Sequence, residues 1–229
     1  TKEDAFRSAR PPSTRQASRL DVKQTSSLKP KPKNEDLVFG KTFTDHMLEI
    51  DWTARHGWHS PVIRPLENFS LSPAVSSLHY GMQCFEGMKA YRGMDGTIRM
   101  FRPDLNMARF NFSMARLSLP PFPEESLLSC IQELLKVDER FIPEGEGYAL
   151  YLRPTAIATD EGLYLTKPTS ARIFVIMTPV GPYYPTGFKP VRLLANTERV
   201  RAWPGGVGNA KCGGNYGPTI ESQVEAAQY

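Results

Sequence analysis

A glycine-rich stretch between Arg201 and Tyr216 constrains this chain more than any other part of its sequence. It surrounds a single amine, that of Lys211, with five glycines: Gly205, Gly206, Gly208, Gly213 and Gly214. Because glycine lacks a Cβ, the backbone there can adopt left-handed conformations, and a flat or anionic ligand can approach the main chain closely. The stretch therefore leaves Lys211 room to hold a cofactor.

Two phosphate-binding motifs are excluded by the residues around Lys211. A P-loop needs Gly before its Lys and Ser or Thr after it, whereas Ala210 and Cys212 stand there. The dinucleotide pattern G-x-G-x-x-G starts at Gly206 and Gly208 but meets Lys211 where it needs its third glycine. Two interpretations stay open: a lysine whose neutral amine forms a Schiff base with an aldehyde cofactor, or a solvated lysine on a flexible surface loop.

Composition excludes several classes of protein. The chain has 229 residues, of which 40% are hydrophobic, enough for the packed core of one large or two modest domains. Residues 1–33 hold nine Lys or Arg against three Asp or Glu, but the rest holds 19 against 21, so no nucleic-acid surface is expected. The longest strongly apolar run, Ile173–Met177, is too short to cross a membrane. Three widely spaced cysteines, without C-x-x-C, indicate neither a disulfide framework nor a zinc knuckle and favour a reducing compartment.

The first 33 residues are rich in Ser, Pro, Arg and Lys and predict a disordered basic tail. Their spaced arginines resemble the remnant of a mitochondrial transit peptide, whereas Glu3, Asp4 and Asp21 argue against one. A mitochondrial and a cytoplasmic location both stay open. The missing initiator Met indicates a fragment.

Hydrophobic periodicity predicts an α/β chain. Alternation over 43–52 and 148–153 indicates strands, the second ended by Pro154, and the β-branched run at 171–180 indicates a buried strand. Helical spacing indicates helices over 73–84, 105–117 and 124–141, the second capped by Asp104. Segments 86–91 and 97–101 form a hairpin through Asp95-Gly96. A linker at 181–189 precedes a last strand at 191–196 and a helix at 218–227.

The helix predicted at 105–117 carries two neighbouring apolar stripes with Arg109 between them. Arg109 is either an arginine that passes the edge of the core to reach solvent, or a clamp that pairs bidentately with a phosphate. The stripes are Leu105, Ala108, Phe112 and Ala115, and Met107, Phe110, Met114 and Leu117.

Two further polar pairs follow from spacing. Tyr151 and Arg153 face the same side of their predicted strand, which brings a hydroxyl and a guanidinium together. His56 and His59 could bind a metal, but no third ligand lies near them in the sequence, so no metal site is predicted.

The wording Arg-Ala-Trp-x-Gly-Gly-Val-Gly-x-x-Lys-x-Gly-Gly-Asn-Tyr-Gly, beginning at Arg201, resembles the cofactor-lysine segment of the branched-chain aminotransferases. These are pyridoxal-phosphate enzymes of fold type IV. The resemblance implies that Lys211 binds pyridoxal 5'-phosphate as a Schiff base and that Tyr216 lies near the cofactor's ring hydroxyl. The segment Asn106-Met107-Ala108-Arg109 also matches and implies that Arg109 binds the cofactor phosphate.

The resemblance extends from about Lys33 to the end of the chain and implies a substrate pocket. Tyr151 and Arg153 would lie near the α-carboxylate or the distal acid of glutamate. Tyr80 would reach across the interface of a homodimer, and Leu163 and Leu165 would be lent to the partner subunit. The implied pocket residues are Phe39, Tyr80, Phe85, Tyr151, Arg153, Leu163, Leu165 and Tyr183.

The fold implied by the resemblance is an α+β small domain at 34–180, a linker at 181–189, and the beginning of a larger α/β domain at 190–229. The reaction implied is reversible amino transfer between leucine, isoleucine or valine and 2-oxoglutarate. Alternatives are a D-amino-acid aminotransferase, an aminodeoxychorismate lyase, or an inactive dimerising fragment. In the family, the carboxylate that pairs with the cofactor's pyridine nitrogen lies beyond the residues matched here, so we expect little activity from these 229 residues alone.

Overall fold

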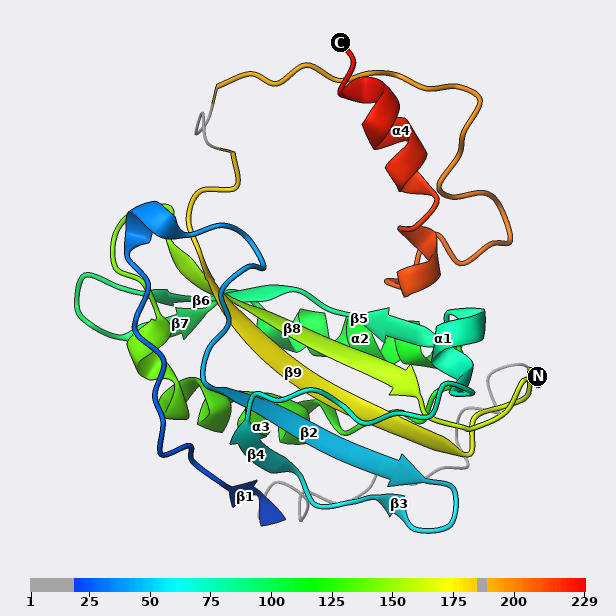
Figure 1. Cartoon of the computed structure of the whole chain (residues 1–229), viewed down its shortest axis with the longest axis horizontal. Coiled ribbons are helices and arrows are strands. Elements are labelled where there is room, and N and C mark those ends of the chain that lie inside the picture. Colours follow the sequence, from blue (N-terminus) through cyan, green and yellow to red (C-terminus); the bar gives the residue numbers. More distant parts are fainter. Residues whose placement is uncertain (1–18, 185–188) are drawn as a thin grey trace.

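The structure, a computed structural model, describes residues 19–184 and 189–229. Its centre is a curled sheet whose strands run in the order β1-β4-β2-β9-β8-β6-β7, with β3 paired to β2 and β5 paired to β8 (Figure 1). All pairs are antiparallel except β1 with β4. The strands are β1 (Asp21–Val22), β2 (His46–Thr53), β3 (Gly57–Trp58), β4 (Val62–Pro65), β5 (Gln83–Phe85), β6 (Met88–Arg92), β7 (Ile98–Met100), β8 (Ala149–Ala158) and β9 (Ser170–Val180).

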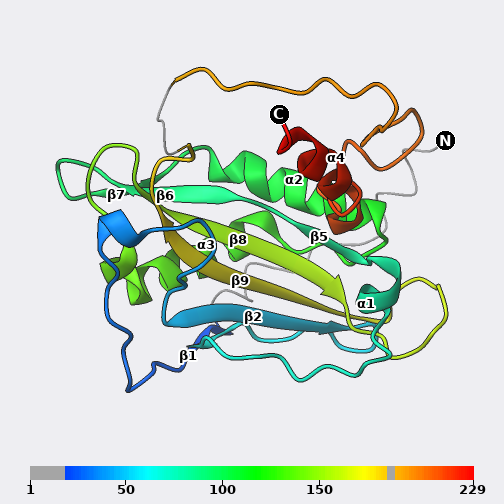
Figure 2. The same ribbon diagram turned by 45° about the horizontal axis from the view of Figure 1, so that its top comes forward.

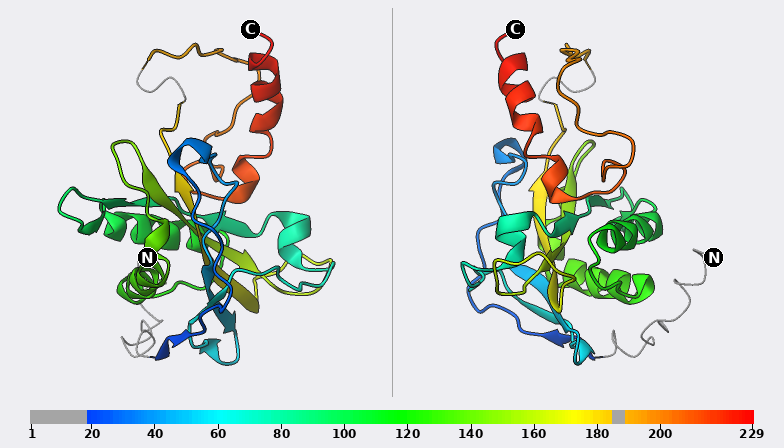
Figure 3. Two further views of the ribbon diagram at one scale, coloured as in Figure 1. Left: turned by 60° about the vertical axis from the view of Figure 1, so that its left-hand side comes forward. Right: turned by 90° about the vertical axis from the view of Figure 1, so that its right-hand side faces the viewer.

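Two long helices cover one face of this sheet. They are α2 (Pro103–Arg116) and α3 (Glu124–Val137), which lie side by side to the right of the strands in Figure 3, right. Their buried residues, among them Phe110 and Ile131, join Leu48 and Leu150 of the sheet in one hydrophobic core. The short helix α1 (Ser76–Tyr80) and the helix α4 (Thr219–Ala226) lie outside this layer.

The predicted amphipathic character of α2 is confirmed, but the two stripes differ in burial. Met107, Phe110 and Met114 are buried, whereas Leu105 and Phe112 are about half exposed, at 48% and 46%. The stripe that faces the core is therefore the one that contains Met107, Phe110 and Met114. The predicted Asp104 cap is wrong: Asp104 lies inside the first turn, after an N-cap at Arg102 and a proline at the first helical position.

The prediction that Pro154 ends its strand is wrong, since β8 continues to Ala158. The Pro154 carbonyl accepts a hydrogen bond from the Glu86 backbone N–H, in the break between β5 and β6. In a strand, the nitrogen and the carbonyl of one residue point to the same side. The Pro154 nitrogen, which has no hydrogen to donate, therefore faces the break between β5 and β6, and the hydrogen bonds between β8 and β9 on the other side are complete.

Two other predicted elements differ from the structure. The helix at 73–84 is only α1, because Gly81 takes a left-handed conformation with φ 61° and the chain then enters β5. Residues 191–196 form no strand, since no other segment of the described chain pairs with them, and Leu193 is 88% exposed. The predicted hairpin is confirmed by the pairing of β6 with β7, and the helix at 218–227 by α4.

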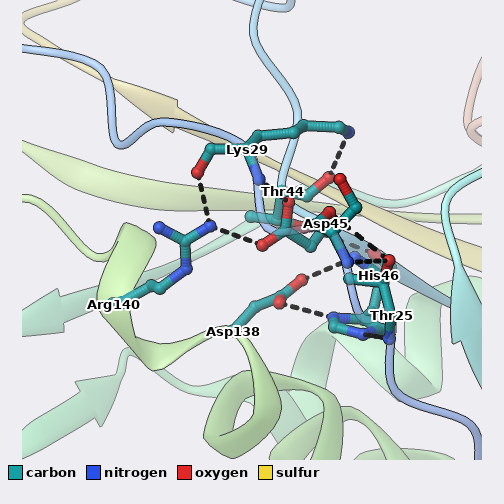
Figure 4. A network of polar contacts seen from close by, with 8 residues as sticks. Thr25, Lys29, Thr44, Asp45, His46, Asp138 and Arg140 are labelled. Carbon is teal, nitrogen blue, oxygen red and sulfur yellow. Dashed lines mark hydrogen bonds and ion pairs between the residues drawn. The ribbon is translucent and has the colours of Figure 1, made fainter.

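Residues 20–33, predicted as part of a disordered tail, lie against the body of the molecule. Thr25 donates its backbone N–H to His46 Nε2 at 2.9 Å, and Lys29 donates its N–H to Asp45 at 3.0 Å (Figure 4). Arg140 donates to both the Lys29 carbonyl and the Asp45 carboxylate. Composition misses this order because Leu20 is the only residue of the segment that packs against the core, and backbone and polar contacts with the body hold the rest. Residues 1–18 lie outside the described part.

Beyond β9 the chain leaves the sheet and returns to it. Residues 189–212 run outward and come back, and the short 3₁₀ helix η5 (Gly213–Asn215) packs against β5 (Figures 1 and 2). The chain then ends with α4. The glycine-rich stretch is thereby brought to the edge of the sheet where β5 meets α2.

Candidate functional site

The backbone of Lys211 is fixed between a strand and a helix. Its N–H donates to Ser113 Oγ of α2 at 2.9 Å, and its carbonyl accepts from the Phe85 N–H of β5 at 3.0 Å. Next to it, Cys84 and Cys212 form an isolated antiparallel bridge. Ser113 is fully buried and in turn donates to the Arg109 carbonyl at 3.0 Å. Residues 85 and 113 therefore determine where residue 211 lies.

Further contacts hold the glycine-rich stretch in place. The Asn215 side-chain amide donates to the carbonyls of Val207 and Ala210 at 3.0 and 2.9 Å, and Arg116 donates to the Gly206 carbonyl at 3.1 Å. A Cβ on Gly213 would come within 2.9 Å of the Gln83 side chain, so a larger residue there would require Gln83 to move away from the loop. These contacts are those of a docked loop and not of a flexible surface loop.

The amine of Lys211 lies between two aromatic rings. Its Nζ donates to the Tyr216 hydroxyl at 3.2 Å and lies 4.5 Å from the centre of the Phe85 ring. The Phe85 and Tyr216 rings contact one another, with their centres 5.0 Å apart. The side chain is only partly buried. The structure thus places a primary amine in an aromatic recess that a small molecule can reach.

A buried carboxylate holds Arg109 beside this recess. Glu86 is fully buried and accepts hydrogen bonds from Arg109 Nε at 2.5 Å and Nη2 at 2.9 Å. The Asn106 amide and the Gly87 N–H complete its shell at 2.9 and 3.0 Å. The hydrogen bond to Glu86 and the charge of Glu86 raise the pKa of Arg109 despite the opposing effect of burial, so the guanidinium stays charged. Because this side chain is 52% exposed, its third nitrogen, Nη1, can meet an anion.

A second cluster adjoins Phe85 and contains the predicted Tyr151–Arg153 pair. Arg153 donates from Nε and Nη2 to the Tyr151 hydroxyl at 3.3 and 3.0 Å, and its guanidinium carbon lies 4.5 Å from the Phe85 ring centre. Phe39 packs edge-on against Tyr151, with ring centres 5.0 Å apart. A continuous series of contacts therefore connects Lys211 with Phe39.

Two cavities lie on this second cluster. The larger, of about 430 Å³, is bordered by Phe39, Tyr151 and Tyr183, and the smaller, of about 200 Å³, is bordered by Phe39, Tyr151 and Arg153. A Cβ on Gly87 would meet the Tyr151 hydroxyl at 2.1 Å, so this glycine makes room for the ring. The combination is an aromatic, largely apolar space with a guanidinium at its rim.

Three of the predicted pocket residues lie elsewhere. Tyr80 donates its hydroxyl to the Leu163 carbonyl of the same chain at 3.0 Å, and Leu163 and Leu165 are each 69% exposed. Their contacts within the described residues do not reach Lys211. We call these three exposed residues, Tyr80 at the end of α1 and the two leucines between β8 and β9, the α1 patch.

Glu86, Asn106 and Ser113 are not among the predicted functional residues. A signal for the first existed: an acid in an apolar strand and an arginine in an apolar helix each lack a partner nearby, and pairing satisfies both. Ser113 carries no such signal, because a serine in a helix is ordinary. Among residues 19–184 and 189–229, no three His, Cys, Asp or Glu side chains converge as metal ligands, and no helix is long and apolar enough to cross a membrane.

Comparison with protein families and curated proteins gives concordant matches. The profile described as Amino-transferase class IV matches residues 83–227. The mitochondrial branched-chain-amino-acid aminotransferase of Saccharomyces cerevisiae is 52% identical over 213 residues, which are 93% of this chain and 54% of that protein. The cytosolic one of Ovis aries is 49% identical over 222 residues, which are 96% of this chain and 58% of that protein. The chain thus spans about half the length of the curated relatives it matches.

Solved structures give the same fold. A branched-chain aminotransferase from Thermoproteus uzoniensis with norvaline superposes with a TM-score of 0.59 at 24% identity, over 78% of this chain and 56% of that one. A branched-chain aminotransferase from T.th. with pyridoxamine 5'-phosphate superposes with a TM-score of 0.54 at 26% identity, over 78% of this chain and 56% of that one.

Proposed function

Since the chain belongs to the class IV aminotransferase family and has the fold type IV architecture, we propose that it supplies the cofactor lysine and substrate pocket of a branched-chain aminotransferase. The proposed reaction is reversible amino transfer between leucine, isoleucine or valine and 2-oxoglutarate. The observation that carries this proposal is the Lys211 amine, held 3.2 Å from the Tyr216 hydroxyl in the aromatic recess beside the Arg109 guanidinium. The names of the curated relatives support the substrate class.

The residues of the recess fit pyridoxal phosphate. Lys211 offers a primary amine for the aldehyde, Arg109 offers an exposed guanidinium nitrogen for the phosphate, and Tyr216 offers a hydroxyl beside both. When bound, the cofactor supplies an aldehyde that condenses with amines and a ring that stabilises negative charge at the substrate's α carbon. One of the solved structures similar to this chain is of a branched-chain aminotransferase with pyridoxamine 5'-phosphate, which supports this choice.

The residues of this chain would each contribute a defined step. Lys211 Nζ would take the proton from the substrate's α carbon and deliver it to the cofactor carbon that carried the aldehyde, because it is the only amine in the recess among the described contacts. The Tyr216 hydroxyl orients Nζ through their hydrogen bond. Phe85 and Tyr216 flank the amine on two sides and limit the directions from which the substrate can approach it.

The second cluster fits both kinds of substrate. Aliphatic side chains would lie against Phe39 and Tyr151 in the apolar cavities, and a carboxylate would pair with Arg153 and the Tyr151 hydroxyl at the rim. Tyr183, which borders the larger cavity and is 77% exposed, would close its outer side. One pocket thereby accepts a leucine side chain and the distal acid of glutamate in turn.

The α1 patch fits a homodimer. Tyr80, Leu163 and Leu165 expose apolar surface that a second copy would cover, so that they line the partner's pocket instead of their own. Within one chain we propose a small domain at 34–180, joined by residues 20–33 along its surface, a linker at 181–189, and a cofactor-binding segment from 190 onward. Curated relatives carry both mitochondrial and cytosolic names, so the compartment stays open between these two.

Covalent trapping tests the cofactor site. The 229-residue chain is mixed with pyridoxal phosphate, reduced with borohydride and digested, and the modified peptide is identified by mass. We expect the modification on Lys211, its loss in Lys211→Ala, and its retention in Lys136→Ala, whose side chain is 69% exposed on α3. Equal labelling of many surface lysines would refute a specific site.

Activity is tested in a chimera in which this chain replaces the matching 213 residues of the yeast mitochondrial relative. We expect leucine-dependent formation of glutamate from 2-oxoglutarate, and none when the chimera carries Lys211→Ala. A chimera that folds, binds the cofactor and accepts only D-alanine would favour the D-amino-acid alternative. One that releases pyruvate from aminodeoxychorismate would favour the lyase, and one that dimerises without binding the cofactor would favour a structural role.

A further inference from the structure

Two of the three cysteines lie directly opposite one another beside Lys211. Cys84 of β5 and Cys212 of the loop are the two members of the isolated bridge, and all three thiols are free. The bond from Phe85 N–H to the Lys211 carbonyl flanks this bridge, which makes it a non-hydrogen-bonded antiparallel pair. In such pairs the Cα atoms are about 4.5 Å apart and both side chains stand on one face. That spacing lies within the range of about 4.4–6.8 Å that a disulfide requires.

We propose that Cys84 and Cys212 are a modification site, at which a peroxide converts the two thiols into a disulfide that ties the Lys211 loop to β5. The proposal rests on the bridge register and on the close approach of the loop to β5, seen again where Gly213 meets Gln83. It does not depend on the aminotransferase reaction.

Burial decides how the oxidation begins. Cys84 is 0% exposed and Cys212 is 3% exposed. Burial raises the pKa of both thiols, and the neighbouring Cys212 and Glu86 raise that of Cys84 further, so the closed pair is protonated and unreactive. Arg116 acts in the opposite direction on Cys212. Cys212 lies on the loop, which can detach locally, whereas Cys84 lies in the sheet. The first attack therefore comes from Cys212 when the loop opens.

The reaction then balances in two steps. The Cys212 thiolate attacks one oxygen of hydrogen peroxide, the S–O bond forms, the O–O bond breaks, and the other oxygen leaves as water after protonation. When the loop closes, the Cys84 thiol attacks the Cys212 sulfur, the S–S bond forms and the S–O bond breaks; the proton of the Cys84 thiol passes to the leaving hydroxyl, which departs as a second water. Two thiols and one peroxide thus yield one disulfide and two waters.

Cys130 provides an internal control. It is buried in α3, far along the chain from both other cysteines, and burial raises its pKa to about 11. No bridge joins it to another cysteine in the described structure. Cys130 is as deeply buried as Cys84 and Cys212, so oxidation that depended on exposure alone would affect all three thiols alike.

The test is oxidation of the folded 229-residue chain by hydrogen peroxide, followed by alkylation and digestion without reductant. We expect two of three thiols to be lost, a cross-linked peptide containing Cys84 and Cys212, and full recovery with dithiothreitol. Amide hydrogen exchange at 211–214 should slow about tenfold or more in the oxidised chain. Cys130→Ser should behave like the parent, and Cys212→Ser should give no cross-link.

Two outcomes would overturn the proposal. One is a cross-link that joins Cys130 to either partner, or that joins separate chains only. The other is oxidation of Cys212 to sulfinic acid while Cys84 stays reduced, which would mean that the closed loop does not bring the sulfurs together. If Cys212→Ser fails to fold, the comparison between the parent and Cys130→Ser still decides between these results.

Discussion

At the scale of single residues, the role of Arg109 depends on a carboxylate that no solvent reaches. Glu86 is 0% exposed and takes two of its four hydrogen bonds from Arg109. A charged group buried so deeply is tolerated only when it is paired and hydrogen-bonded. The pair thus fixes the guanidinium and also stabilises the site.

Replacing Arg109 by alanine should have two separable effects. Binding of pyridoxal phosphate should weaken by about 1.5–3 kcal/mol, roughly tenfold to a hundredfold, through loss of a charge-assisted contact. The fold should lose about 2 kcal/mol or more because Glu86 is left buried and unpaired, with allowance for the half-exposed guanidinium. Cofactor titration measures the first effect and urea unfolding the second.

A double variant separates these effects. Glu86→Gln in the Arg109→Ala background should recover stability, because the uncompensated charge is gone, but it should not recover cofactor affinity. Recovery of both would mean that Arg109 acts through the fold alone. Arg99→Ala, which breaks an exposed pair with Asp95, is the matched control; Arg116 is unsuitable because it contacts the Gly206 carbonyl.

At the scale of elements, α2 gives the sharpest test of the core. Phe110 is 1% exposed and Phe112, two residues on, is 46% exposed. Phe110→Ala should therefore destabilise the chain by about 3–5 kcal/mol through the cavity it leaves, and Phe112→Ala by less than about 1 kcal/mol. Urea denaturation of both variants measures this, and similar losses would show that the helix is rotated relative to the structure.

The same helix shows what periodicity can determine. Both stripes of α2 are apolar, so spacing predicts a helix but not which stripe faces the sheet. That choice depends on how α2 packs against α3 and β5, which no local pattern contains. The prediction of a strand at 191–196 is wrong for a related reason: its residues suit a strand, but a strand forms only where another strand pairs with it.

In the candidate site, too, some residues can be predicted from local sequence and others only from the packing of the folded chain. Lys211, Tyr216, Arg109, Tyr151 and Arg153 follow from motif wording and strand alternation, and the structure brings them into two adjoining clusters. The residues that position them do not follow in the same way. Ser113 lies 98 residues from the amide it holds, so only the folded chain reveals that contact.

At the scale of the whole molecule, a polar network joins residues 20–33 to the sheet (Figure 4). His46 Nε2 accepts from the Thr25 N–H, so Nδ1 carries the ring proton and donates to Asp138 at 2.7 Å. Burial alone would raise the pKa of Asp45, but hydrogen bonds from Arg140 and Lys29 hold it below the ordinary 3.8. The segment is thus held by groups whose charge depends on pH.

We expect this contribution to be sensitive to acid. A carboxyl whose pKa is lower in the folded chain than in the unfolded chain stabilises the fold above its unfolded pKa, and the stabilisation disappears as pH falls through the folded pKa. Asp45→Asn should therefore cost about 2–3 kcal/mol at about pH 7, and the difference from the parent should shrink below about pH 4. Unfolding at a series of pH values measures it.

The control for this prediction is Asp95→Asn, which removes an exposed carboxylate with no buried partner. This substitution should change the free energy of unfolding little at about pH 7 and at about pH 3. A difference between Asp45→Asn and the parent that persists unchanged at about pH 3 would show that the Asp45 charge is not what holds the segment.

The docking of Lys211 onto residues 85 and 113 also sets an order of assembly. A chain synthesised from its N-terminus contains β5, α2, β8 and β9 before residue 211 is made, so every segment onto which the loop docks precedes the loop in synthesis. Heating should reverse this sequence: the loop, held by a few hydrogen bonds, detaches while the sheet is still intact. On warming, the amine would therefore leave its position beside Phe85 and Ser113 while the sheet is still folded, so the recess opens at a lower temperature than the fold.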